Sequence, residues 1–280
     1  MKTLHTLCAI LALQTSVCAV EITVGSTRLT IPAPEGFSLV TSEMQPYADF
    51  AKRFVAPQNE RFALFLPDTD VALAKAGEIP DGARRFEVQV TKQIIKPVIT
   101  KTDFAEIKKM IKTQNDEIMR KAEAEIPGFL KKLTDGLSKD YDVDMSFSSL
   151  QILPMPAHGE TDRSLAFSTL VRYNVDAGTG KIETQEGIVT ATLVHVKGKV
   201  LLLYVHADKP DLEWSKTAAK TLSDQIIAQN PSDAAMSAQE SKPRSSFDWN
   251  SVLRSAIIGA AIGGLVGLIK TLLKKKKPNV

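Results

Sequence analysis

The 280-residue sequence predicts an α+β protein, a twisted antiparallel sheet with packed helices, followed by one C-terminal transmembrane helix. Three observations lead to this fold class. Apolar and polar residues alternate between turns over 163–207, as in a meander of strands. Apolar residues recur at helical spacing over 103–126 and from 210 onwards. Finally, the run 255–269 is apolar and carries no charge.

The chain begins with the pattern of a secretory signal peptide over 1–19. A lysine at position two precedes a short apolar region, and Val17 and Ala19 supply small residues at the −3 and −1 positions of a cut. A lipoprotein is the alternative, with Cys18 as the lipidated residue, but the three preceding residues depart from the usual lipoprotein pattern. A cut after Ala19 would remove both cysteines, so the mature chain would have neither a disulfide nor a thiol nucleophile.

A single globular domain is expected over 20–230. Its long helix has capping-box spacing between Asp103 and Glu106, and Pro127 should limit its end. In chain order, the expected elements are a hairpin over 22–31, a short helix over 45–54, strands over 61–66 and 84–95, a long helix over 103–126, a short helix over 128–139, an edge strand over 146–153, the meander over 163–207 and a closing helix from 210 to 226.

Residues 231–250 are small, polar and aperiodic, which predicts a flexible tether. The transmembrane helix is expected over 252–273, followed by a basic cytoplasmic tail over 274–280. A buried soluble helix is the alternative, and the four consecutive lysines disfavour it. The expected membrane-interface anchors are Trp249, Arg254, Lys270, Lys274, Lys275, Lys276 and Lys277.

The apolar run has a glycine pattern of its own. Gly259, Gly263 and Gly267 recur every four residues, and Ser255 extends the row backwards. In a helix these residues form one smooth face, which lets two membrane helices approach closely. The row therefore predicts a homo-oligomer formed through the membrane helix, although glycine is also simply common in such helices.

The charge distribution supports a membrane topology. Of the 35 Lys and Arg residues, one lies in 1–19 and six lie in 252–280, which leaves 28 against 32 acidic residues for the rest. A nucleic-acid partner is not expected, because the basic excess lies beside the apolar run and not on the domain. Signal peptide and lysine cluster together predict a single-pass membrane protein, with the domain in the periplasm or outside the cell and the lipid bilayer as its first partner.

The layout of the domain resembles the PsbP-like fold, an antiparallel sheet sandwiched by helices. The resemblance rests on Pro32-Ala-Pro34-Glu-Gly36-Phe37 after an opening hairpin, on the meander over 163–207 and on the last helix, which bears Trp214. It covers most of 22–230 and includes no catalytic motif. The resemblance implies an accessory or assembly factor and assigns no residue a role.

The sequence contains no strong motif for catalysis, a metal or a cofactor, so none is expected. His195 and His206 should face Leu201 and Thr190 across one hairpin, too far apart to share a metal, and His158 lies in a Pro/Gly loop. The acidic run 140–144 fails the calcium-loop pattern, because Met145 and Gln151 stand where that pattern needs Gly and an acid. Gly178-Thr-Gly180-Lys181 is interpreted as a hairpin turn and not as a phosphate loop.

These observations predict a membrane-anchored extracytoplasmic binding or assembly protein that acts on an envelope protein or ligand not identified by the sequence. The alternative is a membrane-tethered hydrolase whose carboxylates are scattered along the chain. An enzyme should have a pocket with convergent polar groups, whereas a binding domain should have an exposed apolar patch or groove.

Overall fold

The computed structural model describes residues 19–80, 82–141, 146–176, 180–231 and 248–266. Its centre is a seven-stranded antiparallel sheet with the strand order β3-β4-β5-β9-β8-β7-β6. The strands are β3 (Phe37–Leu39), β4 (Asn59–Pro67), β5 (Arg85–Thr91), β6 (Ser146–Pro154), β7 (Ser164–Asp176), β8 (Ile182–Val196) and β9 (Lys199–Asp208). The α+β sheet predicted by the alternation of residues is therefore confirmed.

The opening hairpin forms a separate two-stranded sheet of β1 (Ala19–Val24) and β2 (Thr27–Pro32). The hairpin between β8 and β9 turns through Lys197 and Gly198, which both have positive φ, as the tight turns of right-twisted strands require. The helices are α1 (Gln45–Lys52), α2 (Asp68–Lys75), α3 (Lys101–Tyr141), α4 (Leu212–Gln229) and α6 (Trp249–Gly263), with single 3₁₀ turns at Ser42–Met44, Lys92–Ile94 and Lys209–Asp211.

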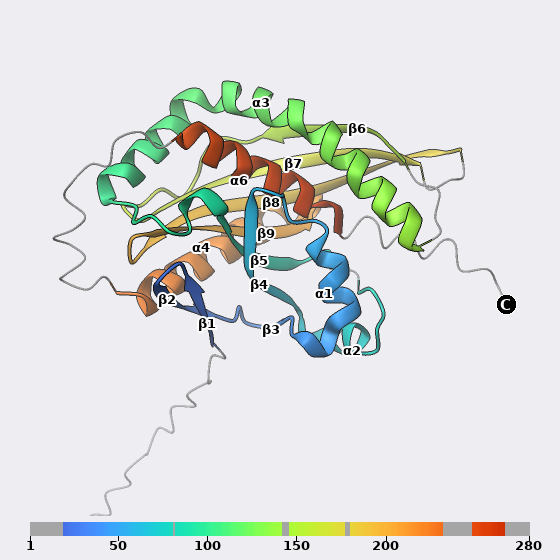
Figure 1. Cartoon of the computed structure of the whole chain (residues 1–280), viewed down its shortest axis with the longest axis horizontal. Helices are drawn as coiled ribbons and strands as arrows, with labels where there is room; N and C mark the ends of the chain where they lie inside the picture. The colour runs from blue at the N-terminus through green and yellow to red at the C-terminus, as the bar shows by residue number, and fades with distance from the viewer. Residues whose placement is uncertain (1–18, 81, 142–145, 177–179, 232–247, 267–280) are drawn as a thin grey trace, which may run out of the picture.

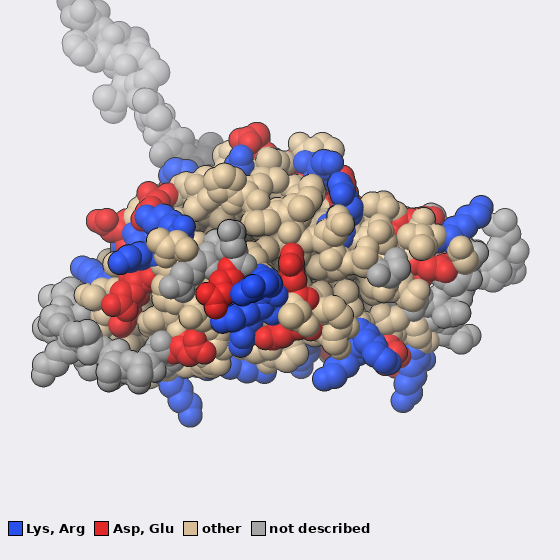
Figure 2. All heavy atoms as spheres, turned by 90° about the horizontal axis from the view of Figure 1, so that it is seen from above, with Lys and Arg blue, Asp and Glu red and all other residues tan. Residues whose placement is uncertain are grey.

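Helices cover both faces of the sheet, and the strand alternation decides which residues meet which helix. On β8, the hydroxyl of Thr190 bonds to Ser215 of α4, while its neighbour Ala191 pairs with Tyr204, whose hydroxyl bonds to α6. α4 therefore lies on one face, and α6 lies on the other between the sheet and α3 (Figure 1). On the outer face that includes α3, acidic and basic side chains are interspersed (Figure 2).

The long helix α3 differs from the prediction. Pro127 was expected to end it and a second short helix was expected over 128–139, but one helix continues through the proline. The apolar positions explain this, because Ile126, Leu130, Leu133 and Leu137 are all buried and continue one stripe at helical spacing. Burial of that stripe outweighs the single backbone hydrogen bond that a proline removes.

The predicted transmembrane helix is wrong. In the part of the chain that the structure describes, no helix is both long and apolar enough to cross a membrane. The first part of the apolar run instead lies in a 15-residue helix, α6, which begins at Trp249 and is buried against the sheet and α3. A helix that is apolar all round needs an apolar or enclosed environment, and a protein core supplies one as well as lipid does. The predicted localisation as a single-pass membrane protein depends on this helix and is therefore also wrong. Residues 1–18 of the predicted signal peptide lie outside the described residues.

Candidate functional site: a polar network beneath helix α6

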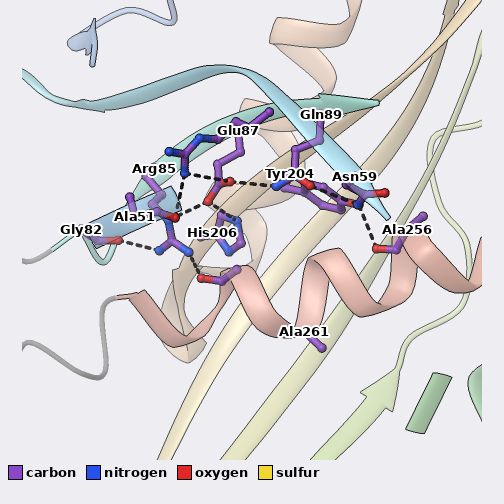
Figure 3. A network of polar contacts seen from close by, with 12 residues as sticks. Ala51, Asn59, Gly82, Arg85, Glu87, Gln89, Tyr204, His206, Ala256 and Ala261 are labelled. Carbon is purple, nitrogen blue, oxygen red and sulfur yellow. Dashed lines mark hydrogen bonds and ion pairs between the residues drawn. The ribbon is translucent and has the colours of Figure 1, made fainter. Parts of the chain in front are cut away.

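Strand β5 presents a charged face to the interior. Arg85, Glu87 and Gln89 alternate with Phe86 and two valines, and all seven residues of the strand are buried. The apolar side faces the α4 layer, and the charged side lies beneath α6 (Figure 3). Burial of ionised groups is costly unless they are paired, so the partners of these side chains decide whether the face is stable.

The polar side chains form one connected network. The carboxylate of Glu87 accepts hydrogen bonds from Arg85 Nε at 3.2 Å and from Gln89 Nε2 at 2.9 Å. Gln89 Oε1 accepts in turn from Asn59 Nδ2 at 3.1 Å, and Arg61 of β4 approaches Glu87 at 3.8 Å. This set is called the polar network below, together with Tyr173, Tyr204 and His206, which lie on the same face of β7 and β9.

The polar network binds the backbone of α6. Asn59 Nδ2 donates to the carbonyl of Ser255 at 3.2 Å, and the hydroxyl of Tyr204 donates to that of Ala256 at 2.9 Å. The hydroxyl of Tyr173 donates to Ala261 at 2.6 Å, and Arg85 Nη2 donates to Gly263. Four strands thus contribute one donor each to α6. The last two carbonyls lie near the C-terminal end of the helix, where carbonyls lack helical partners and a cation is favoured.

The small residues of α6 make this approach possible. A Cβ placed on Gly259 would lie 2.7 Å from Asn59 Nδ2 and 2.8 Å from the Tyr204 hydroxyl, and one on Gly263 would lie 2.6 Å from His206 Cε1. A Cβ on Gly264 would collide with the Tyr173 hydroxyl. The smooth face that predicts helix pairing in lipid therefore packs against polar side chains of the sheet, and Gly264 packs against them as well.

The other residues singled out in this segment have defined places where the structure describes them. Ser255 is buried and its hydroxyl donates to Ser251 O at 2.8 Å. Trp249 is 7% exposed and therefore lies in the protein interior. Arg254 pairs with Glu125 of α3 at 2.9 Å and lies at the edge of that interior. The remaining predicted residues, Gly267, Lys270, Lys274, Lys275, Lys276 and Lys277, lie outside the described residues.

Two side chains at one end of the polar network have buried atoms without hydrogen-bond partners. These atoms are the hydroxyl of Tyr47 from α1 and both ring nitrogens of His206, of which Nε2 lies 3.5 Å from Glu87 Oε1 without forming a hydrogen bond. Burial, and then the charge of Arg85, hold the pKa of His206 well below its usual value, so its ring is neutral. Burial raises the pKa of Tyr47 to about 12. The sequence pattern of β5 alone could not reveal these two residues, because they come from other elements.

The histidines are not brought together. His195 pairs with Val200 and His206 with Val189, one residue from the expected register. His195 stacks on Phe104 with ring centroids 5.2 Å apart and bonds to Ile99 O, whereas His158 bonds to Ser168 on the other face. Among the described residues, no group of three His, Cys, Asp or Glu could hold a metal ion.

Comparison with known proteins supplies a fold resemblance and no function. No protein-family model matches the chain, and no curated protein matches it. Among solved structures, it is similar to cyanobacterial PsbP (CyanoP) from Synechocystis sp. PCC 6803, with 12% identity, a TM-score of 0.30, and coverage of 81% of this chain and 98% of that one. The Ran-binding protein Mog1p of Saccharomyces cerevisiae follows, with 10% identity, a TM-score of 0.24, and coverage of 77% and 93%. The suspected PsbP-like resemblance is thereby confirmed as a weak likeness of fold.

Proposed function

We propose that this chain is a non-catalytic binding protein with an accessory or assembly role, and that the polar network is a receptor for an apolar helix with small residues four apart. One observation carries the proposal: four strands each donate a side-chain hydrogen bond to a backbone carbonyl of α6. Backbone carbonyls are common to all helices, so this mode of binding selects for a helix that fits closely and not for one particular sequence.

The small residues supply the selectivity. Any side chain larger than glycine at the positions of Gly259 or Gly263 would displace the donors beneath it. A partner helix should therefore be apolar, because α6 is buried along almost its whole length, and should carry Gly at two positions one turn apart. In this chain α6 occupies the site itself, so a partner would bind by taking its place.

The geometry does not favour the hydrolase alternative. The Ser–His pair of the described residues is Ser168 with His158, at 2.8 Å. Ser168 has no exposed surface, and its hydroxyl is already shared with Thr190 at 2.9 Å, so a substrate cannot reach it. The side chains of the polar network that bond to α6 are likewise buried.

A cut-and-exchange experiment tests the proposal. A protease site placed within 232–247 would separate α6 covalently from the domain. A fluorescent peptide of residues 248–266 should then bind to the cut protein, as measured by anisotropy, and displace the original helix. The same peptide with Gly259→Leu should bind at least about tenfold more weakly, since one lost charge-free hydrogen bond and a steric clash each cost about 1 kcal/mol or more.

The matched control is a peptide with Ile257→Leu, a change of similar volume at an apolar position that the donors do not contact. It should bind like the parent peptide. Equal binding of the Gly259→Leu and parent peptides would contradict the proposal, and so would a cut helix that never exchanges.

A further inference from the structure

A second candidate site lies on the opposite face of the sheet. A pocket of about 310 Å³ opens between α4, the strands β7 and β8, and the loop that carries His158. Lys216, Lys220 and Ser223 line it from α4, and Ser164 and Thr192 line it from the strands. The volume is at the lower end of small-molecule sites, so an ion or a small metabolite would fit.

Thr192 distinguishes this pocket from an ordinary surface hollow. Its side chain is 2% exposed and its hydroxyl has no hydrogen-bond partner. Thr190, two residues earlier on the same face, shows the usual situation, because its hydroxyl bonds to Ser168 at 2.9 Å and to Ser215 at 2.8 Å. A buried hydroxyl without a partner is unfavourable, so something that lines the pocket should satisfy it.

The charged side chains at the pocket are paired, but their pairs are close to solvent. Glu160 lines it but is paired with two lysines of α3, which also hold the pKa of that carboxyl below its usual value. Lys216 pairs with Glu213 at 2.8 Å, and Lys220 pairs with Asp224. Among the lining residues, Lys216 and Lys220 therefore balance Glu160 and Asp224, and the two lysines of α3 add positive charge through their pairs with Glu160. The carboxylates are exposed at the rim, where solvent weakens their pairs with lysine.

We propose that this pocket binds a small molecule through a phosphate or carboxylate group, with Thr192 and the ammonium groups of Lys216 and Lys220 as donors. Hydroxyl and ammonium groups are the donors that oxyanions prefer, and bonds to a charged acceptor are stronger than neutral ones. The hydroxyls of Thr161 and Ser164, which bond to each other at 2.8 Å, lie at the same pocket and can turn toward a bound oxygen.

The test titrates the full chain with inorganic phosphate and, separately, with acetate, at ionic strength held constant with chloride. Backbone amide shifts in ¹H–¹⁵N spectra are the readout. Saturable shifts at Thr192 and Ser164 are expected with at least one anion, and the better of the two identifies the ligand group. Thr192→Val should weaken that binding about tenfold, which is the effect of losing one hydrogen bond to a charged group.

Thr192→Val is suited to this test because valine has the shape of threonine and removes only the unpartnered hydroxyl. The variant should unfold at the same temperature as the parent or higher, so weaker binding would not reflect misfolding. Lys220→Gln should also weaken binding. Lys121→Gln is the matched control, because Lys121 also pairs with an acid one turn away, Glu117, but lies on α3 away from the pocket.

Two results would overturn the proposal. One is the absence of a saturable shift at the pocket with either anion, which would mean that the pocket holds water only. The other is equal anion binding by Thr192→Val, Lys220→Gln and the parent.

Discussion

Gly263 of α6 lies against the ring of His206 of β9 so closely that a Cβ on the glycine would come within 2.6 Å of Cε1. Both residues are buried, and the ring nitrogens of His206 have no hydrogen-bond partner. The contact replaces the helix–helix contact that the glycine row predicts in lipid. It also means that the packing of α6 depends on residues without side chains.

Gly259→Ala should therefore destabilise the protein by about 1–3 kcal/mol, because the new methyl group overlaps Asn59 and Tyr204 and forces both donors away from α6. Chemical denaturation measures the change. Gly128→Ala in α3 is the control, since no atom lies within 4 Å of its Cβ position. It should instead raise stability by about 0.5–1 kcal/mol, as alanine does within a helix. A stabilising Gly259→Ala would show that α6 does not pack as described.

Acidification should lower the free energy of unfolding, because His206 takes up a proton when the chain unfolds. Its pKa is lowered in the folded state by burial and by Arg85, so the unfolded chain binds the proton more readily. Stability is then complete above the unfolded pKa of about 6.5 and falls as the pH drops below it, by up to about 1.4 kcal/mol per pH unit. Denaturation between pH 5 and 7 measures this slope.

His206→Gln should reduce that slope, because glutamine does not titrate. A smaller slope should remain, since desolvation also lowers the pKa of His158. An unchanged slope in His206→Gln would mean that another group causes the acid sensitivity.

Arg85 and Glu87 should behave as a coupled pair. Arg85→Met leaves the Glu87 carboxylate buried without its closest cation, and it should cost about 3–5 kcal/mol. The double variant Arg85→Met with Glu87→Met should cost less than the sum of the two single changes, because it strands neither charge. A double-mutant cycle from denaturation curves measures the coupling, and strict additivity would contradict it.

Trp249 and Arg254, which the sequence assigns to a membrane interface, should contribute differently to stability because they differ in burial. Trp249→Ala should cost about 3–5 kcal/mol, because a large side chain is removed from the interior. Arg254→Ala should cost less than about 1 kcal/mol, because its pair with Glu125 is partly exposed to solvent. Thermal unfolding compares them, and a larger effect of Arg254→Ala would argue against the placement of α6.

The sheet could be predicted from the sequence because alternation is a local property. The meander, the opening hairpin and the edge strand all follow from it, and so does the weak PsbP-like resemblance. The continuation of α3 through Pro127 could not, because only the buried stripe beyond the proline decides it. The position of α6 against the sheet is the feature that the sequence supports least. An apolar helix is equally compatible with lipid and with a core, and nothing local to Ser255 or Gly259 reveals donors that lie 50 to 200 residues away.

The four carbonyl contacts also bear on the order in which the molecule assembles. α6 follows every strand it covers in the chain, so the sheet can pair while Arg85, Glu87 and Gln89 are still hydrated. During that stage the uncovered face is charged, and water solvates it well. An apolar face in the same position would invite other chains to associate. We therefore expect the charged face beneath α6 to make the unfinished protein less prone to aggregation, while the desolvation of those groups when α6 docks lowers the final stability.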